Sequence, residues 1–190
     1  MGILTTLSHE DAAISSDHRD ICSAGYRELG SVISAFIDRG FSANLARDIQ
    51  ALLAPRIDRL DCLPFQHPVP AGCYERRIMF LDRKQRFTIL GLQWMPGART
   101  PIHGHRAWGV VGVIDGEIDN ISYELRKGCT NNDTPTETGR NTAKAGSICT
   151  VAPAPASIHA LHNSSDHPVT TVHIYGMDLS RNHTAINKLY

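Results

Sequence analysis

The sequence predicts a mainly β fold: a small antiparallel barrel or sandwich preceded by a helical segment. Three observations support this prediction. From about residue 66 onward, short apolar or alternating runs are separated by turn residues. Between residues 24 and 53, apolar residues recur at helical spacing instead. The length of 190 residues suits one domain with a real core. We expect one structural domain, in which a helical segment (1–65) packs on a barrel (66–190).

Two helices are expected in the first part. Segment 24–39 places apolar residues on one helical face, namely Leu29, Ile33, Phe36 and Ile37. Gly40 is a plausible stop for this helix. Ser42 or Asn44 is expected to cap a second helix, whose apolar face is Leu45, Ile49, Leu52 and Leu53. Both apolar faces are interpreted as core packing.

The strand region begins after a proline-rich connection at residues 64–70. Its apolar or alternating runs are YERRIMFL, RFTILGLQW, AWGVVGVI, IDNISYEL, SICTVA and VTTVHIYG. Asp115-Gly116 lies between two of these runs and predicts a hairpin. The polar stretch from Arg126 to Lys144 is expected to be a loop. Arg83, Lys84 and Arg86 are expected to be solvated.

Charge and composition exclude some classes of function. Basic and acidic residues both number 19, so neither a nucleic acid nor an anionic membrane is favoured as a partner. No apolar run approaches the roughly 18–20 residues that span a bilayer, and the start lacks the basic and apolar regions of a signal peptide. The five cysteines are widely spaced without a CxxC motif. A cytoplasmic location is therefore expected.

The pair His103-Gly104-His105 carries the strongest functional signal. It lies in a segment that is typical of a strand, where residues two apart point to the same face. Both imidazoles can therefore reach one metal ion from one side. A third histidine, His159, follows another strand-like segment. Three nitrogen ligands leave coordination positions open, which suits a metal that performs chemistry.

The spacing around this pair resembles the cupin pattern. Gly97 precedes the pair and Gly116 closes the motif, while His159 and Asn163 match the end of the second cupin motif. His162 competes with His159 as the third ligand, and the spacing to the asparagine favours His159. The glutamate position of the first motif holds Gly109 instead. Three neutral imidazoles leave the full charge on a divalent ion, which favours an anionic thiolate as a further ligand.

From about Tyr74 to Tyr175 the chain resembles the bacterial thiol dioxygenases, which comprise the cysteine dioxygenase family and its 3-mercaptopropionate dioxygenase branch. The motifs are TPIHGHRAWGVVGVIDGE, the first histidine of ASIHALHN, and TTVHIYG. The resemblance implies one non-haem Fe(II) per chain, held by His103, His105 and His159. It also implies a relay in the pattern S-x-H-x-Y, which here reads Thr171, His173 and Tyr175.

The same resemblance implies a substrate-binding pattern Tyr-x-Arg/Gln. Here it reads Tyr74-Glu75-Arg76, with Arg77 adjacent, and either arginine could hold the substrate carboxylate. Arg76 shares a strand face with Tyr74 and is favoured. Animal members cross-link a cysteine to the active-site tyrosine. Gly109 and Val110 occupy that region here, so no such cross-link is expected.

The expected activity is oxidation of a small thiol to a sulfinic acid by dioxygen. L-Cysteine is favoured, and 3-mercaptopropionate or mercaptosuccinate remains an alternative. More distant alternatives are a three-histidine cupin that cleaves carbon–carbon bonds and a metal-binding cupin without enzymatic activity. The expected partners are the thiol and dioxygen only. The sequence leaves the oligomeric state and the metal bound in the cell open.

Overall fold

The computed structural model describes residues 24–40, 42, 44–60, 69–126, 134–182 and 184–190. Both expected helices are confirmed: α1 covers Ala24–Asp38 and α2 covers Leu45–Leu53. Asn44 occupies the N-cap position of α2, although its side chain makes no capping hydrogen bond. A short 3-10 helix, η1, follows at Ile57–Arg59, and a one-turn helix, α3, at Leu179–Asn182. None of the helices in these ranges is long and apolar enough to cross a bilayer.

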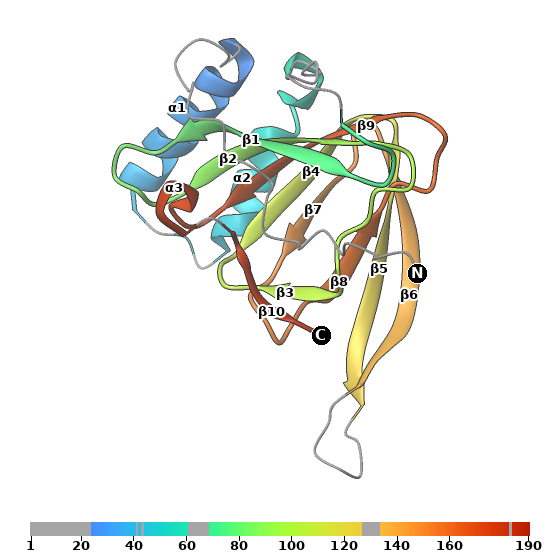
Figure 1. Cartoon of the computed structure of the whole chain (residues 1–190). Helices are drawn as coiled ribbons and strands as arrows, with labels where there is room; N and C mark the ends of the chain where they lie inside the picture. Colours follow the sequence, from blue (N-terminus) through green and yellow to red (C-terminus); the bar gives the residue numbers. More distant parts are fainter. Residues whose placement is uncertain (1–23, 41, 43, 61–68, 127–133, 183) are drawn as a thin grey trace, which may run out of the picture.

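Ten strands in the described ranges form two antiparallel five-stranded sheets (Figure 1). The first sheet has the order β1-β2-β9-β4-β7, with strands Tyr74–Leu81, Thr88–Trp94, Val169–Tyr175, Gly109–Asp115 and Ile148–Val151. The second has the order β10-β3-β8-β5-β6, with strands Ile186–Leu189, His103–His105, Ile158–His162, Glu117–Arg126 and Thr134–Lys144. The expected mainly β fold with N-terminal helices is confirmed.

The first sheet separates two cores, because successive side chains of a strand point to opposite faces. On β9, Val172 and Ile174 join a cluster with the buried faces of α1 and α2. On the same strand Tyr175 joins a second cluster inside the barrel, with Leu92 of β2 and Leu161 of β8. The helices thus cover the outer face of this sheet and leave its inner face for the barrel interior. Residues 1–23 and 61–68 lie outside the described ranges, so the division at residue 65 stays a prediction.

The expected hairpin at Asp115-Gly116 is wrong. β4 pairs with β7 and β9, whereas β5 pairs with β6 and β8, so the chain passes here from one sheet to the other. Gly116 has φ +79, and a Cβ there would lie 2.9 Å from Val169 Cγ2. Glycine permits this sharp corner, since other residues strain at positive φ. The two-residue signal marks a turn without specifying that its flanking strands pair.

The expected loop at 126–144 is also wrong over most of its length. β5 extends to Arg126, and residues 134–144 form β6, which pairs along β5 from Glu117↔Lys144 to Arg126↔Thr134. Residues 127–133 lie outside the described ranges. Most side chains of β6 are exposed, which explains why its sequence lacks an apolar alternation. Pairing with β5, together with a hydrogen bond from Thr142 to the buried Asp119, holds this polar strand in the sheet.

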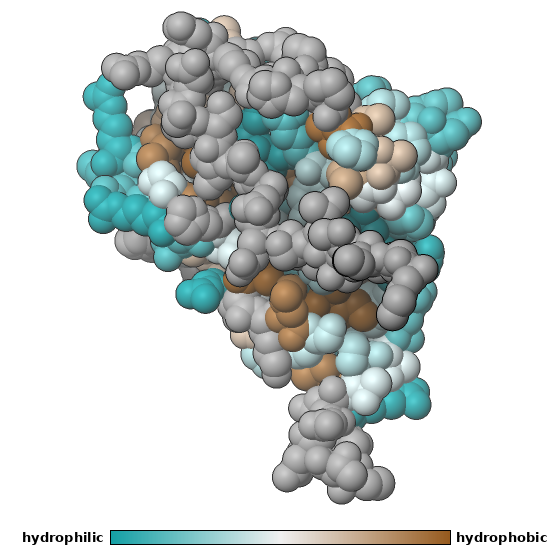
Figure 2. Space-filling view, viewed as in Figure 1, coloured by the Kyte–Doolittle hydropathy of each residue, from teal (hydrophilic) through white to brown (hydrophobic). Residues whose placement is uncertain are grey.

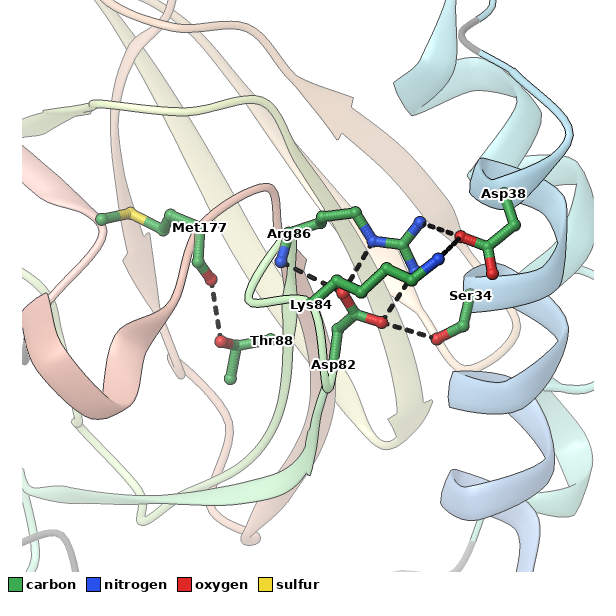
Figure 3. Close-up of polar contacts among 7 residues, drawn as sticks. All are labelled: Ser34, Asp38, Asp82, Lys84, Arg86, Thr88 and Met177. Carbon is green, nitrogen blue, oxygen red and sulfur yellow. Dashed lines mark hydrogen bonds and ion pairs between the residues drawn. The ribbon is translucent and has the colours of Figure 1, made fainter.

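Arg86 was expected to be solvated, and this prediction is wrong. Its side chain joins α1 to the turn between β1 and β2 (Figure 3). Its guanidinium contacts the buried carboxylate of Asp82 through Nε at 2.7 Å and also reaches Asp38 on α1. Ser34 of α1 donates a further hydrogen bond to Asp82. Lys84 agrees with the expectation, because its side chain is 65% exposed. Figure 2 shows hydrophilic side chains along this edge of the molecule, at the left of the view.

A second contact in Figure 3 holds the C-terminal segment against β2. The Thr88 hydroxyl donates to the backbone carbonyl of Met177 and accepts from the backbone N–H of Leu179. This anchor lies at the start of α3 and precedes β10. The segment then pairs with β3 through β10, which brings its residues 184–186 to the barrel interior.

Candidate metal centre

The structure brings His103, His105 and His159 together inside the barrel. The first two lie on β3, and His159 is directly opposite His103 on β8. Their ring centroids are 4.7–5.1 Å apart. One nitrogen of each ring lies within 4.8 Å of the other two, and all three residues are buried. This geometry suits binding of a single ion.

Two of these rings are oriented by hydrogen bonds to carbonyl oxygens. The Nδ1 atom of His103 lies 2.8 Å from the backbone oxygen of Pro101, and that of His159 lies 2.8 Å from Asn120 Oδ1. A carbonyl oxygen only accepts, so the proton of each ring resides on Nδ1. The Nε2 lone pair of each ring is therefore left for a metal, as in most histidine-ligated sites. Asn120 could not be predicted from the sequence, because no local motif links it to His159.

The third ring also fits a metal ligand. His105 Nε2 lies 2.9 Å from His159 Nε2, and its buried Nδ1 has no hydrogen-bond partner among the described residues. Burial lowers the pKa of His103, and it lowers the pKa of His105 and His159 to about 3. All three rings are therefore neutral near pH 7, which is the form that binds metals. The donor set fits one divalent transition-metal ion, and its three imidazoles suit several such metals.

His162, the rival third ligand, lies outside the cluster. It pairs with Asp119 across β5 and β8, whereas His159 pairs with Ser122. Residues an odd number of positions apart on a strand point to opposite faces. The register of β8 therefore places the His159 ring inside the barrel and directs His162 to the outer face.

Gly109, at the position of the cupin glutamate, lies opposite Tyr175 in the pairing of β4 with β9. A Cβ at residue 109 would lie 2.8 Å from Tyr175 Cε1, closer than real contacts of this kind. A glutamate there would have to displace the tyrosine ring. Glycine at residue 109 thus leaves room for the tyrosine ring and adds no fourth ligand to the three histidines.

Thr171, His173 and Tyr175 share the inner face of β9 and form a hydrogen-bonded chain. Thr171 Oγ1 lies 2.9 Å from His173 Nε2, and His173 Nδ1 lies 3.1 Å from the Tyr175 hydroxyl. Burial lowers the pKa of His173 to about 3, so this ring is neutral. Burial also raises the pKa of Tyr175, which keeps the phenol protonated. The Tyr175 ring stacks on His105 at a centroid distance of 5.1 Å.

Trp94 is a further residue that the sequence analysis missed. It is fully buried, and its indole Nε1 donates to Thr171 Oγ1 at 2.8 Å. Its ring packs on Tyr74 with centroids 4.5 Å apart. Trp94 lies on β2 at even spacing from two interior leucines, Leu90 and Leu92, so strand alternation was a usable signal for its inward direction.

The two candidate arginines have different surroundings. Arg77 is bound to Glu75 through Nε and one terminal nitrogen, at 3.0 and 2.9 Å. Arg76 lines the histidine cavity together with Tyr74, and its buried Nε has no hydrogen-bond partner within the described ranges. Of these two arginines, only Arg76 is among the residues that line this cavity.

The cavity next to the three histidines has a volume of about 50 Å³. It is lined by residues of both sheets and of the C-terminal segment, namely Tyr74, Arg76, Leu90, Leu92, Trp94, Thr100, His103, His105, His159, Leu161, His173, Tyr175, Thr184, Ala185 and Ile186. The last three were not anticipated, because their place depends on the pairing of β10 with β3. A space of this size holds a few water molecules or a very small organic molecule.

No protein-family model matches this chain. Its fold is similar to solved cupin structures at low identity. A sugar phosphate isomerase of the cupin superfamily from Silicibacter pomeroyi is 18% identical with a TM-score of 0.38, and the match covers 47% of this chain and 49% of that chain. The chain thus spans about half the length of that protein. A Cupin_2 domain of a transcriptional regulator from Enterobacter cloacae is 22% identical with a TM-score of 0.41, covering 54% and 94%.

A protein with a double-stranded β-helix domain from Klebsiella pneumoniae is 18% identical, with a TM-score of 0.43 and coverage of 59% and 79%. Oxalate oxidase in complex with glycolate is 17% identical, with a TM-score of 0.43 and coverage of 58% and 53%. These likenesses concern the β fold.

Proposed function

We propose that this protein is an Fe(II)-dependent thiol dioxygenase that converts a small carboxylate-bearing thiol, with L-cysteine favoured, to its sulfinic acid. The proposal rests on the set of residues that line one cavity. Three neutral imidazoles converge in it, and Arg76, whose buried Nε has no hydrogen-bond partner among the described residues, lines it as well. A site that holds a metal beside an arginine suits a ligand with both a metal-binding atom and a carboxylate.

The charges around the cavity support a substrate with one carboxylate. Among the described residues that line it, Arg76 is the single lysine or arginine, and no aspartate or glutamate is present. A dicarboxylate such as mercaptosuccinate would have one guanidinium for its two carboxylates, so the second carboxylate would need the metal ion as its cationic partner. Cysteine and 3-mercaptopropionate each carry one carboxylate, so 3-mercaptopropionate is the stronger alternative. The volume of about 50 Å³ also favours a molecule of few heavy atoms.

The donor set favours a thiolate over a neutral thiol. His103, His105 and His159 carry no negative charge, so they leave the charge of a divalent ion uncompensated, and this lowers the pKa of a thiol bound there. Fe(II) held there would catalyse the reaction of the thiolate with dioxygen, which transfers both oxygen atoms to sulfur. Arg76 would hold the carboxylate, and Tyr175 would offer a hydrogen bond within the same cavity.

Oxygen uptake tests the proposal. The protein is loaded with Fe(II) without air and then given cysteine, 3-mercaptopropionate, mercaptosuccinate or a diketone in aerated buffer. We expect uptake with a monocarboxylic thiol and a product that has gained two oxygen atoms. A protein that is loaded with iron but consumes no oxygen with any thiol would refute the proposal. Uptake with the diketone alone would instead assign a carbon–carbon bond-cleaving dioxygenase.

A further inference from the structure

A chain of buried hydrogen bonds begins at Trp94 and ends at Tyr175. Trp94 Nε1 donates to Thr171 Oγ1 at 2.8 Å, Thr171 Oγ1 lies 2.9 Å from His173 Nε2, and His173 Nδ1 lies 3.1 Å from the Tyr175 hydroxyl. Trp94 and Thr171 are fully buried, and His173 and Tyr175 are 3% and 7% exposed. The positions of the heavy atoms, combined with the chemistry of each group, determine where the protons lie.

The donor and acceptor roles along these hydrogen bonds follow from Trp94, the first residue in the series. An indole N–H only donates, so Thr171 accepts from Trp94. The single hydroxyl proton of Thr171 then has His173 Nε2 as its acceptor, at 2.9 Å. A neutral imidazole whose Nε2 accepts carries its proton on Nδ1. His173 therefore donates from Nδ1 to the Tyr175 oxygen, and the phenol proton of Tyr175 is left free for another acceptor.

We propose that Trp94 is a positioning residue that sets this direction and thereby makes the Tyr175 hydroxyl a hydrogen-bond donor to a ligand in the histidine cavity. In the reverse arrangement, Tyr175 would donate to His173 Nδ1, and His173 would donate from Nε2 to Thr171. The Thr171 oxygen would then accept twice, and its own proton would lack an acceptor among the contacts of the described residues. Burial makes such an unsatisfied donor unfavourable.

The surroundings of Trp94 hold its indole in place. Its ring packs on Tyr74 at a centroid distance of 4.5 Å, and its backbone oxygen accepts a hydrogen bond from Asn163 Nδ2 at 3.1 Å. β2 and β9 pair without interruption from Thr88↔Tyr175 to Trp94↔Val169. The indole donor and its acceptor, Thr171, therefore lie on adjacent strands of a continuous ladder. All four residues of the hydrogen-bond chain therefore lie on these two paired strands.

The chemical role of the Tyr175 hydroxyl rests on the proposed function, whereas the direction of the hydrogen bonds does not. A free phenol proton donates to an atom that gains negative charge, such as an oxygen that is being transferred to sulfur. A Tyr175 whose proton was committed to His173 would offer only lone pairs to that atom.

Nitrogen NMR of the histidine rings tests the direction without any activity. In the metal-free protein near pH 7.5, long-range proton–nitrogen spectra distinguish a ring protonated on Nδ1 from one protonated on Nε2. We expect His173 in the wild-type protein to be protonated on Nδ1 only. A wild-type His173 protonated on Nε2 would overturn the inference, even if every variant failed to fold.

Trp94→Phe tests the role of the indole, since it keeps an aromatic ring against Tyr74 and removes the donor. We expect both His173 tautomers to be populated in this variant. Ile33→Val, a conservative change in the helix-side core, is the control and should leave the wild-type tautomer unchanged. A folded Trp94→Phe protein whose His173 remained solely protonated on Nδ1 would show that the indole does not set the direction.

If the protein oxidises a thiol, Trp94→Phe should lower kcat roughly tenfold and leave KM little changed. A tenfold change corresponds to the free-energy contribution of about one hydrogen bond. A changed tautomer with unchanged kcat would separate Trp94 from the chemistry. The absence of activity in the wild-type protein would refute the proposed function and leave the NMR result standing.

Discussion

His159 lies directly opposite His103 on antiparallel strands, with ring centroids 4.7 Å apart. This one register completes the three-histidine cluster. A slip of β8 by one residue would turn His159 to the outer face of the barrel and bring His162 to the inner face. The Asn120 hydrogen bond to His159 comes from β5, which pairs with β8 on its other side.

His159→Ala is expected to abolish tight binding of Fe(II) or of a substitute such as Co(II), because it removes one of three ligands. His162→Ala is the matched control, three residues along the same strand, and should bind the metal like the wild-type protein. Calorimetry or the Co(II) absorption spectrum measures both. Loss of binding in His162→Ala alone would exchange the roles of the two histidines.

Asn120→Ala is expected to weaken metal binding by roughly 10- to 100-fold, since it removes the acceptor that orients the His159 ring. Asn141→Ala on β6, opposite Asn120 but exposed, is the control and should have no effect. Competition with a chelator of known affinity measures the difference. Equal affinities in the two variants would contradict a role for Asn120.

Arg76→Gln is expected to raise KM for L-cysteine by roughly 10- to 100-fold, because it removes a charge-assisted pair with the carboxylate. Arg77→Gln is its matched control, because that guanidinium is bound to Glu75 outside the cavity. Steady-state oxygen uptake provides both constants. A KM that rose in Arg77→Gln and not in Arg76→Gln would assign the carboxylate to the other arginine.

Gly109→Ala is expected to lower kcat, because its Cβ would lie 2.8 Å from Tyr175 Cε1 and push the ring from its place. The expected loss is at least about tenfold, given the sensitivity of positioned groups to small displacements. Gly139→Ala, where no atom lies within 4 Å, is the control. Oxygen uptake and thermal unfolding together separate a moved Tyr175 from a general loss of stability.

Stability should fall at low pH because of Asp82. Its hydrogen bonds to Arg86 lower the pKa of this carboxyl from 3.8 to about 2 in the folded protein. A lowered folded-state pKa stabilises the protein fully above the unfolded-state value, and the contribution is lost as the pH falls through the folded value. Asp82→Asn should therefore cost about 2 kcal/mol of unfolding free energy at pH 7 and much less near pH 2.

Urea unfolding at the two pH values measures this difference. Lys84→Met is the control, because the exposed lysine contributes little to stability at either pH. A cost of Asp82→Asn that stayed the same at both pH values would show that the ion pair with Arg86 does not set the acid sensitivity.

Much of the fold and the site could be predicted from local patterns. The apolar spacing of residues 24–53 predicted α1 and α2 because a helix places residues three and four apart on one face. Alternation along a strand predicted that His103 faces the same way as His105, and that Thr171, His173 and Tyr175 share a face. These features depend only on the geometry of a single element.

The tertiary structure decided what depends on pairing between distant strands. It placed His159 rather than His162 in the cluster, and Arg76 rather than Arg77 in the cavity. It also brought Trp94 into a hydrogen bond with Thr171, and Asn120 into one with His159. It also separated β4 and β5 at Asp115-Gly116 and made residues 134–144 a strand. The sequence by itself determines which side chains share a face of a strand, since that follows from backbone geometry. Only the fold determines which strand lies opposite that face, since long-range burial and hydrogen bonding select the pairing.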